Sequence, residues 1–530
     1  MADMNLETFV HHLHFDVDQL YPSDWEVNWA DAPLPYKLYR GQLEIPLSGH
    51  LPLTLLSREA PVEPNLATIG HFLWLAYGLG QLSQTFLPST QPPMFHHAYR
   101  RFPPSGGALY PSELYVYLKM DEIPSGVYHY NAAHHRLVLL REGNFDAYLG
   151  RSLIHPCDIS RCFGALFVST VFWKNFFKYN QFAYRLQGMD AGAAIGQALE
   201  VAERFGLETT VCFQFLDRAV HHLLGLEESQ ENVYAVLPLS THPTTTWFHP
   251  LATEDRPEIC DGDLCRELEP LQTAQFIKSR TILPYPSLLE MQRASGLASH
   301  GQAPTIRWPV GAVPSDHDGA ARWKLPPAEC PSYDLLAVCR RRYSPGMDFA
   351  WCPLDARKLS SLLWNAASTS YKTDIYHPDG RLPSGFEWYA VVHGVKGVPD
   401  GAYAYGAEPH VLTLIAPGDH RLFLQQSMTM HTVNLSEVPI CLHLGGDRHH
   451  WIRELGVRGY RIQQMVAGML TQRLLLSAAA LGMNGHPLLG FDSAACDHLY
   501  QLGSRGQTSL VQIPVGHTRA GTRWTGSLHS

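Results

Sequence analysis

The hydrophobic positions in the first half of the chain predict helices and short strands in a definite order. Residues 66–80 carry apolar side chains at helical spacing and end on a glycine, which predicts a helix. Residues 182–206, rich in Ala, Gly and Gln on one side, predict a longer helix. Apolar or alternating runs predict strands at 113–118, 126–130, 136–140, 165–171 and 232–238.

The second half repeats this order at a nearly constant spacing. The predicted strand at 387–392 parallels 113–118, and the Tyr460-Arg461 pair parallels Tyr184-Arg185. These offsets are 274 and 276 residues, and such steadiness over ~130 residues indicates a tandem duplication. We therefore predict an N-terminal lead-in at 1–60, domain 1 at 61–245, an irregular connector at 246–330 and domain 2 at 331–530.

Composition narrows the class of protein. The 530-residue chain is 45% hydrophobic and 17% charged, as expected for a folded protein of two or three domains. Its net charge of −9 argues against a nucleic-acid partner, and no apolar run reaches the ~18 residues of a membrane span. A secretory signal is not expected, and ten scattered cysteines without zinc-finger spacing favour a reducing cytoplasm and no metal.

One stretch, Arg100 to Pro111, stands directly before the predicted strand at 113–118 and contains Pro104-Ser105-Gly106-Gly107. Two adjacent glycines let a backbone approach a flat or charged ligand, and a Ser hydroxyl with exposed N–H groups can hold phosphate or ring oxygens. These four residues alone also fit an ordinary turn. The longer stretch, with its two arginines, resembles a motif of the azoline dehydrogenases, the SagB-type branch of the flavin-dependent nitroreductase superfamily.

This resemblance implies an α+β fold in each domain, nitroreductase-like, with a mostly antiparallel sheet flanked by helices. Nitroreductases are typically dimers that hold two flavins at the subunit interface. Two tandem domains in one chain therefore imply an intrachain pseudo-dimer, and the implied cofactor is FMN.

The family's flavin site takes an Arg-x-Ser-x-Arg opening, a glycine turn and a C-terminal basic residue from one subunit, and the Pro-Ser-Gly-Gly loop from the other. In domain 2, residues 339–344 resemble the opening, with Arg342 where the family usually has Ser. Residues 485–492 resemble the turn whose backbone N–H lies near flavin N5. Arg340 and Arg519 are the implied anchors of the FMN phosphate. The implied cofactor-binding residues are Arg100, Arg101, Pro104, Ser105, Gly106, Gly107, Arg340, Arg341, Arg342, Ser344, Leu489, Gly490 and Arg519.

The other half-sets are degraded. Domain 1 has no arginine around 50–54, has Val211–Gln214 in place of the turn, and has Pro243 opposite the terminal arginine. Domain 2 has Pro378-Asp379-Gly380-Arg381 opposite the loop, although Pro383-Ser384-Gly385 lies just beyond. Independent drift would scatter losses over both sites. We therefore expect one working site, formed by the domain 1 loop and the domain 2 turn, and one inactive pseudo-site formed by the reverse pair.

Azoline dehydrogenases carry a Lys-Tyr pair upstream of a Tyr-Arg, and Lys178-Tyr179 stands before Tyr184-Arg185 here. A lone Lys-Tyr more often is a solvated lysine beside a half-buried aromatic ring. At the matching offset, however, domain 2 has Glu454-Leu455, so the pair is also lost from the degraded set. Ring oxidation needs a base for the α-proton, and the resemblance implies Lys178 and Tyr179 as catalytic residues without assigning the base.

The function that the resemblance implies is oxidation of thiazoline or oxazoline rings in a peptide, ribosomal or carrier-bound, with O₂ as electron acceptor and a cyclodehydratase as a partner. Two alternatives stay open. One is an NAD(P)H-dependent nitro or quinone reductase, and the other is a non-catalytic scaffold subunit of a heterocycle-forming complex. The sequence does not give the peptide, the ring preference or the oligomeric state.

Overall fold

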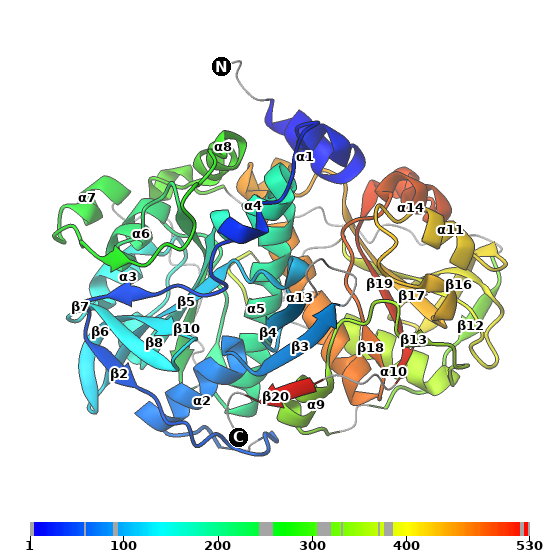
Figure 1. The fold of residues 1–530 in the computed structure, drawn as a ribbon, viewed down its shortest axis with the longest axis horizontal. Coiled ribbons are helices and arrows are strands. Elements are labelled where there is room, and N and C mark those ends of the chain that lie inside the picture. Colours follow the sequence, from blue (N-terminus) through cyan, green and yellow to red (C-terminus); the bar gives the residue numbers. More distant parts are fainter. Residues whose placement is uncertain are drawn as a thin grey trace.

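The computed structural model describes residues 5–57, 60–87, 94–242, 258–304, 320–329, 332–368, 371–375, 385–519 and 524–527. Within them the chain forms two sheet-containing halves on either side of a pair of long helices (Figure 1). The predicted α+β fold with two tandem domains in one chain is confirmed.

The sheet of the first half has seven strands in the order β2-β7-β6-β5-β8-β10-β9, and every neighbouring pair is antiparallel. The predicted strands are all present, each extended by up to a few residues because ladder hydrogen bonds continue beyond the apolar run. The strands are β2 (Glu44–Pro46), β5 (Ser112–Met120), β6 (Ile123–Asn131), β7 (Arg136–Glu142), β8 (Gly164–Val171), β9 (Glu208–Thr209) and β10 (Glu231–Ser240).

The sheet of the second half repeats this order through β12-β16-β15-β14-β17-β19, and β18 lies beside β19 as β9 lies beside β10. A further strand, β13, also pairs with β19. Central strands correspond one to one: β14 is bordered by β15 and β17 as β5 is bordered by β6 and β8. The strands are β12 (Arg322–Lys324), β13 (Phe349–Ala350), β14 (Glu387–Val392), β15 (Gly401–Gly406), β16 (Val411–Pro417), β17 (Ile440–Asp447), β18 (Asn484–Gly485) and β19 (Gln507–Thr518).

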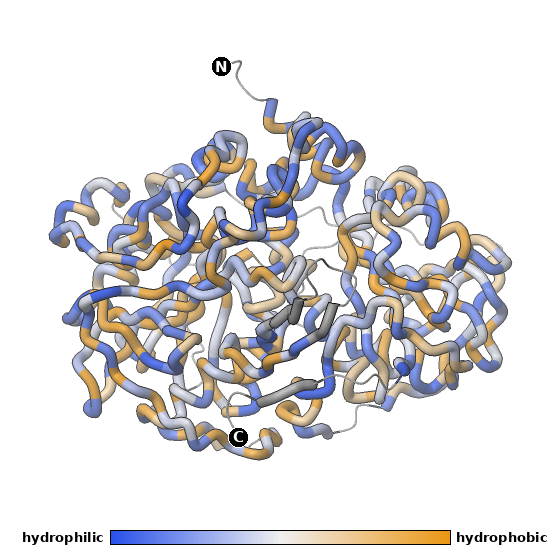
Figure 2. Tube along the Cα trace, in the orientation of Figure 1, coloured by the Kyte–Doolittle hydropathy of each residue, from blue (hydrophilic) through white to orange (hydrophobic). Residues whose placement is uncertain are grey.

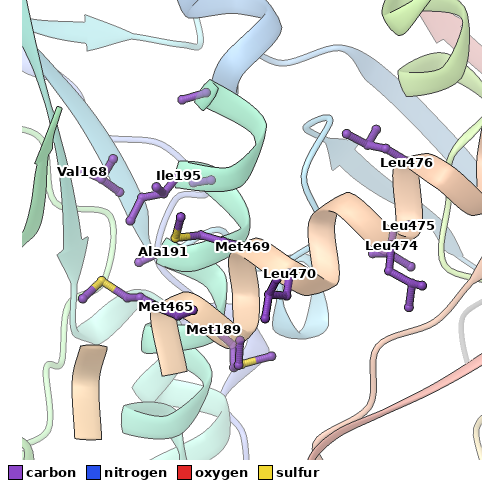
Figure 3. Close-up of a cluster of buried hydrophobic side chains, with 14 of the residues drawn as sticks. Val168, Met189, Ala191, Ile195, Met465, Met469, Leu470, Leu474, Leu475 and Leu476 are labelled. Atoms are coloured by element: carbon purple, nitrogen blue, oxygen red, sulfur yellow. The ribbon is translucent and has the colours of Figure 1, made fainter. Parts of the chain in front are cut away.

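Two long helices, α5 (Ala183–Arg204) and α13 (Arg458–Ala480), cross between the sheets and form the centre of the molecule (Figure 1). Their contact is built from Met, Ala, Ile and Leu side chains (Figure 3). The other helices are α1 (Leu6–Phe15), α2 (Leu66–Tyr77), α3 (Asp146–Ser152), α4 (Trp173–Tyr179), α6 (Asp217–Leu224), α7 (Asp261–Cys265), α8 (Pro286–Ser295), α9 (Leu335–Arg341), α10 (Ala356–Ala367), α11 (Arg421–Gln426), α12 (Ile452–Leu455) and α14 (Ser493–Tyr500).

Two glycines make this crossing possible. A Cβ atom on Gly192 would lie 2.0 Å from the carbonyl oxygen of Met465, and one on Gly468 would lie 2.3 Å from that of Met189. No residue with a side chain fits at either place. Both pairs are related by the 276-residue offset of the duplication, so the two halves meet about a pseudo-twofold axis, as the implied pseudo-dimer requires.

The duplication extends into the lead-in and the connector. β2 pairs with β7 and β12 pairs with β16 in the same register. Beyond these strands, Leu47 donates its N–H to the carbonyl of His135 (3.1 Å), and Leu325 donates to that of His410 (3.2 Å). The strand inside the connector is therefore a second copy of a lead-in strand.

Helices α1 and α8 complete this relation. The buried guanidinium of Arg185 donates to the carbonyl of Leu13 in α1 (2.9 Å), and that of Arg461 donates to the side chain of Gln292 in α8 (2.7 Å). These arginines are equivalent under the 276-residue offset. The connector thus contains a helix, α8, that is hydrogen-bonded to the long helix of domain 2, as the lead-in helix α1 is hydrogen-bonded to the long helix of domain 1.

The C-terminal strand crosses back to the first half. β20 (Trp524–Ser527) pairs with β3 (Gln81–Leu87), which pairs with β4 (Met94–Arg100), to make a separate three-stranded sheet (Figure 1). β4 ends at the start of the stretch singled out from the sequence. Domain 2 therefore contributes a strand to the sheet that leads into the domain 1 loop.

Hydropathy follows this architecture. Hydrophobic and hydrophilic positions are intermixed along most helices and strands, and hydrophilic positions are frequent in the outer turns (Figure 2). The buried apolar side chains form one large core that includes both long helices and two smaller ones under the outer faces of the sheets. Among the described helices, none is both long and apolar enough to cross a membrane.

Candidate functional site

A cavity of about 350 Å³ lies where the two halves meet, and both contribute to its walls. From the first half it receives the end of β4, the Pro104–Ala108 loop and one face of α5. From the second half it receives the chain after α9, the turn after α13 and a residue of β19. Its lining residues are Ser83, Arg100, Pro104, Ser105, Gly106, Gly107, Ala108, Tyr110, Leu186, Met189, Asp190, Ala193, Arg342, Tyr343, Ser344, Gly468, Thr471, His486, Pro487, Leu489 and Val511.

The loop is held from α5 by the carboxylate of Asp190. The Ser105 hydroxyl donates to one carboxylate oxygen (2.6 Å), and the Gly106 N–H donates to the other (3.0 Å). The Ser105 oxygen in turn accepts the N–H of Tyr110 (2.9 Å). The sequence predicted that the serine hydroxyl would serve a ligand, but its proton is engaged by Asp190. Within the described chain, the N–H groups of Ser105 and Gly107 donate to no protein acceptor.

Lys178 and Tyr179 meet the loop at Gly107, from the C-terminal end of α4. A Cβ atom on Gly107 would lie 2.5 Å from the Tyr179 hydroxyl and 2.8 Å from the Lys178 ammonium. Gly107 has φ of +62°, so glycine is favoured there for its backbone as well as for its size. The structure therefore brings the predicted catalytic pair against the predicted loop.

Burial shifts the pKa values of both side chains away from their ordinary values, and in opposite directions. Burial lowers the pKa of Lys178, whose ammonium lies over the rings of Tyr179 (4.8 Å to the centroid) and Trp29 (5.4 Å). Burial raises the pKa of Tyr179 further above its usual value, and the nearby Asp190 adds to the rise. Lysine thus becomes a better proton acceptor at neutral pH, while the phenol stays protonated.

Arg342 supplies a buried cation on the opposite wall. It is the C-terminal cap of α9, where the backbone leaves the helix in an extended conformation. Its Nε donates to the carbonyl of Phe102 (2.8 Å), and its own carbonyl accepts from the Arg100 guanidinium. Its Nη1 is buried and has no partner among the described residues. Burial, with the charge of Arg100, lowers the pKa of Arg342 to about 10, so it stays charged at neutral pH and suits an anionic ligand.

The structure divides the residues of the predicted arginine-rich opening. Arg342, Tyr343 and Ser344 line the cavity. Arg340 and Arg341 are exposed on the last turn of α9. The helix ends at Arg341, and the residues from Arg342 to Ser344 turn toward the cavity.

Two other predicted arginines, Arg101 and Arg519, do not line the cavity that both halves form. The Arg101 guanidinium is buried and donates to the carbonyls of Tyr77 (2.6 Å) and Pro35 (2.9 Å), so it fastens the lead-in to α2. Arg101 and Arg340 border a separate cavity of about 280 Å³ that shares Arg100 with the first. Arg519 has a side chain that is 64% exposed, with its guanidinium 3.7 Å from the carboxylate of Glu437.

The predicted glycine turn reaches the cavity at Leu489. Hydrogen bonds hold it on both sides: the Leu488 N–H donates to the carbonyl of Gln512 (2.8 Å), and the Gly490 carbonyl accepts the N–H of Thr429 (3.0 Å). In the part of the chain that the structure describes, the N–H groups of Leu489 and Gly490 donate to no protein acceptor. A fixed turn with free donors beside a cavity suits a ligand that carries a hydrogen-bond acceptor.

The equivalent turn of domain 1 is closed by the protein itself. The N–H groups of Phe213 and Gln214, equivalent to Leu489 and Gly490, donate to the two carboxylate oxygens of Asp374 (2.9 and 2.7 Å). The bridge between Cys212 and Val236 matches that between Leu488 and Gln512, so the comparison is in register. Burial raises the pKa of Asp374 to about 7. The domain 2 loop of this pseudo-site, residues 378–384, lies outside the described residues, as does Pro243.

Sequence reasoning did not single out Asp190 or Asp374 as functional. A signal for Asp190 was present, since an acidic residue stands on the tight face of a helix where the second half has Val466. No sequence signal distinguishes Asp374, because its partners lie about 160 residues away. Among the described residues there is no group of three or more His, Cys, Asp or Glu that could hold a metal ion.

Comparison with known proteins identifies the family of the chain. The model of the Nitroreductase family matches residues 63–239 and 340–517. A putative nitroreductase from Anabaena variabilis has the same fold over 97% of this chain and 99% of its own, with a TM-score of 0.73 and 21% identity. The trifolitoxin-processing protein TfxB of Rhizobium leguminosarum is 30% identical over 149 residues, which are 27% of this chain and 40% of TfxB. The oxygen-insensitive NAD(P)H nitroreductase of Enterobacter cloacae is 46% identical over 43 residues, 8% of this chain and 20% of that enzyme. The chain belongs to the nitroreductase family and carries two copies of its domain in tandem.

Proposed function

We propose that this chain is an FMN-dependent dehydrogenase that oxidises thiazoline or oxazoline rings of a peptide to thiazoles or oxazoles. One observation carries the proposal: Lys178 and Tyr179, the pair typical of azoline dehydrogenases, converge on the loop of a cavity that both halves of the chain complete. The name of TfxB describes a protein that processes trifolitoxin, and it supports a peptide as the substrate class. The match spans less than half of that relative.

The residues around the cavity fit FMN. The orphaned Nη1 of Arg342 and the hydroxyl of Ser344 suit the phosphate and its ester oxygens. The free N–H groups of Leu489 and Gly490 suit an acceptor at the edge of the flavin ring, and the glycines at 106 and 107 leave room for a flat ring system. The expectation that Arg340 and Arg519 anchor the phosphate has no support from their exposed positions.

The chain's own residues then account for the proton transfer. FMN, when bound, supplies a hydride acceptor at N5. In this proposal Lys178, with its lowered pKa, accepts the proton from the α-carbon of the azoline ring. Tyr179 keeps its proton and orients the ring or passes a proton to the lysine. The acceptor that we propose for the electrons is O₂, and the partner that supplies the azoline peptide is a cyclodehydratase, both in the cytoplasm.

The short match to NAD(P)H nitroreductases favours a second candidate, a reductase of nitro compounds or quinones that draws electrons from NAD(P)H. Two measurements test the candidates. The first is the absorbance spectrum and flavin content of the purified chain, where one FMN per chain is expected. The second is mass spectrometry of a cyclised peptide, where each azoline should lose two hydrogens in air without NADPH.

Bleaching of the flavin by NADPH, together with an unchanged peptide mass, would move the reductase to first place. A colourless protein that takes up no FMN would contradict both candidates and favour a scaffold role.

A further inference from the structure

The carboxylate of Asp190 is buried in the wall of the working site without a cationic partner. Its side chain lies on α5, is 6% exposed and accepts hydrogen bonds from Ser105 and Gly106 alone within the described chain. A buried carboxylate without a counter-charge is costly, and burial raises the pKa of Asp190 to about 7. Residues that destabilise a fold in this way are commonly retained for a role at a site.

The duplication shows that the fold does not need an acid at this position. The equivalent residue of α13 is Val466, which is fully buried. At the matching offset the Lys178-Tyr179 pair is replaced by Glu454-Leu455. The acid and the Lys-Tyr pair are thus present together in the working site, and both are absent from the equivalent positions of domain 2.

The contacts of Asp190 explain why the acid and the pair occur together. By taking the Ser105 proton and the Gly106 N–H, the carboxylate pulls the turn onto α5. The next residue is Gly107, where an added Cβ atom would collide with the Tyr179 hydroxyl and the Lys178 ammonium. A shift of the turn would therefore open or close the gap between the pair and the cavity.

We propose that Asp190 is a positioning residue of the working site: its carboxylate fixes the Ser105–Gly107 turn for Lys178 and Tyr179, and it places a negative charge beside the bound flavin. This inference rests on the proposed function for the flavin and the substrate. Asp190 lines the cavity that we propose for FMN, so its carboxylate lies beside the bound flavin in this proposal. Removing a negative charge beside a flavin favours its reduced, anionic form.

The ionisable groups around Asp190 come from α2, α4, β4 and the end of α9, and from the turn after α13, where burial lowers the pKa of His486. Tyr77 on α2 and Tyr179 on α4 are the nearest, and both phenols are kept protonated by raised pKa values. The guanidiniums of Arg100 and Arg342 line the same cavity from β4 and from the end of α9. Asp190 is therefore the group in this set with a pKa near neutrality.

The test compares Asp190→Asn with Asp374→Asn in the full chain. Both acids are buried, both accept backbone N–H groups and both have a pKa of about 7, but Asp374 closes the pseudo-site. At pH 8 we expect Asp190→Asn to shift the two-electron equilibrium of bound FMN toward the reduced form by ~10-fold, about +30 mV. We also expect kcat for azole formation to fall ~10-fold or more with KM little changed. Asp374→Asn should leave the potential and kcat unchanged.

A measurement on the flavin-free chain checks the ionisation itself. The folded pKa of each acid lies above its unfolded value, so ionisation destabilises the fold as pH rises from about 4 to 7. Both asparagine variants should therefore gain Tm relative to the parent between pH 5 and pH 8. Asp190→Val, which copies Val466, serves as the second variant and should show the same shift in potential.

The outcomes are distinct. Azole formation by the parent with no change of potential or kcat in Asp190→Asn would overturn the role of Asp190 and leave the proposed function standing. A shifted potential in a parent that does not oxidise azolines would leave the placement of Asp190 and overturn the proposed function. In the flavin-free chain, an Asp190→Asn variant with no pH-dependent gain in Tm would show that the fold does not raise the pKa of Asp190. It would contradict the uncompensated buried carboxylate from which the inference starts, and would overturn it.

Discussion

The two sites at the interface between the halves are built from equivalent turns. They differ in the acceptor of the backbone N–H groups of the turn. In the working site the N–H groups of Leu489 and Gly490 are free beside a cavity. In the pseudo-site the equivalent N–H groups, of Phe213 and Gln214, are taken by Asp374. Buried backbone donors must find an acceptor. A site that has lost its ligand is therefore expected to gain an acceptor from the chain, and a site with free donors is expected to have an external one.

The cations near the two turns differ in their charged partners. Arg342 donates to a backbone carbonyl, and its Nη1 has no partner among the described residues. Near the pseudo-site, Arg458 donates to the carbonyl of Phe213 (2.8 Å) and pairs with the carboxylate of Asp217 (2.6 Å), although its Nη2 also has no partner among the described residues. The cation with a carboxylate partner is thus the one at the pseudo-site.

The largest effect is expected at the catalytic pair. Lys178→Ala should keep FMN bound and lower the rate of azole formation ~10²–10⁴-fold, since a general base is lost. Glu454→Ala, the matched change in domain 2, should leave the rate nearly unchanged. Tyr179→Phe should cost less than Lys178→Ala if the phenol only orients the ring. Mass spectrometry of a cyclised peptide measures all three, and full activity of Lys178→Ala would contradict the proposed chemistry.

Gly107→Ala should have the next largest effect. The added methyl would meet the Tyr179 hydroxyl at 2.5 Å and the Lys178 ammonium at 2.8 Å, so the pair must move. A displacement of about 1 Å costs ~10²-fold in a positioned reaction. Gly385→Ala is the control, because it also has positive φ (+134°) but its nearest neighbour would be 3.9 Å away. That variant should lose some Tm and keep the rate; equal losses of rate in both would point to backbone strain alone.

Arg342→Ala and Arg519→Ala compare the two arginines that are candidate ligands of the FMN phosphate. A charge-assisted contact with phosphate contributes on the order of 1.5–3 kcal/mol, so FMN affinity should fall ~10-fold or more in Arg342→Ala. Arg519→Ala should change it little, because that side chain is 64% exposed and its carboxylate partner among the described residues, Glu437, lies 3.7 Å away. Quenching of FMN fluorescence by the flavin-free protein measures both. A larger effect at Arg519 would favour the assignment made from the sequence motif.

Asp374→Ala should have the smallest functional effect. It leaves the N–H groups of Phe213 and Gln214 without an acceptor, at a cost of about 1–3 kcal/mol for each buried donor. We expect a lower Tm and still one FMN per chain, since the vacated turn lacks an equivalent of Arg342. Thermal unfolding and flavin content are the measurements. A second FMN bound by this variant would show that Asp374 alone keeps the pseudo-site inactive.

Much of the architecture was determined by the sequence alone. The apolar periodicity predicted five of the seven strands of the first sheet, all but the short strands β2 and β9. The 274- and 276-residue offsets predicted the second copy. Local patterns suffice for this because a strand or helix must bury a face of fixed period. The loop with Gly106-Gly107 and the Lys178-Tyr179 pair were also found from sequence, because each is a contiguous motif.

Only the tertiary structure decided which side chains act together. The end of α9 turns Arg342 inward and leaves Arg340 exposed, a difference of two residues that a motif match does not resolve. Asp190 meets the loop across 84 residues of sequence, and Asp374 meets the domain 1 turn across about 160. Helix phase, chain reversal and burial set these contacts, and each depends on the packing of the two halves about α5 and α13.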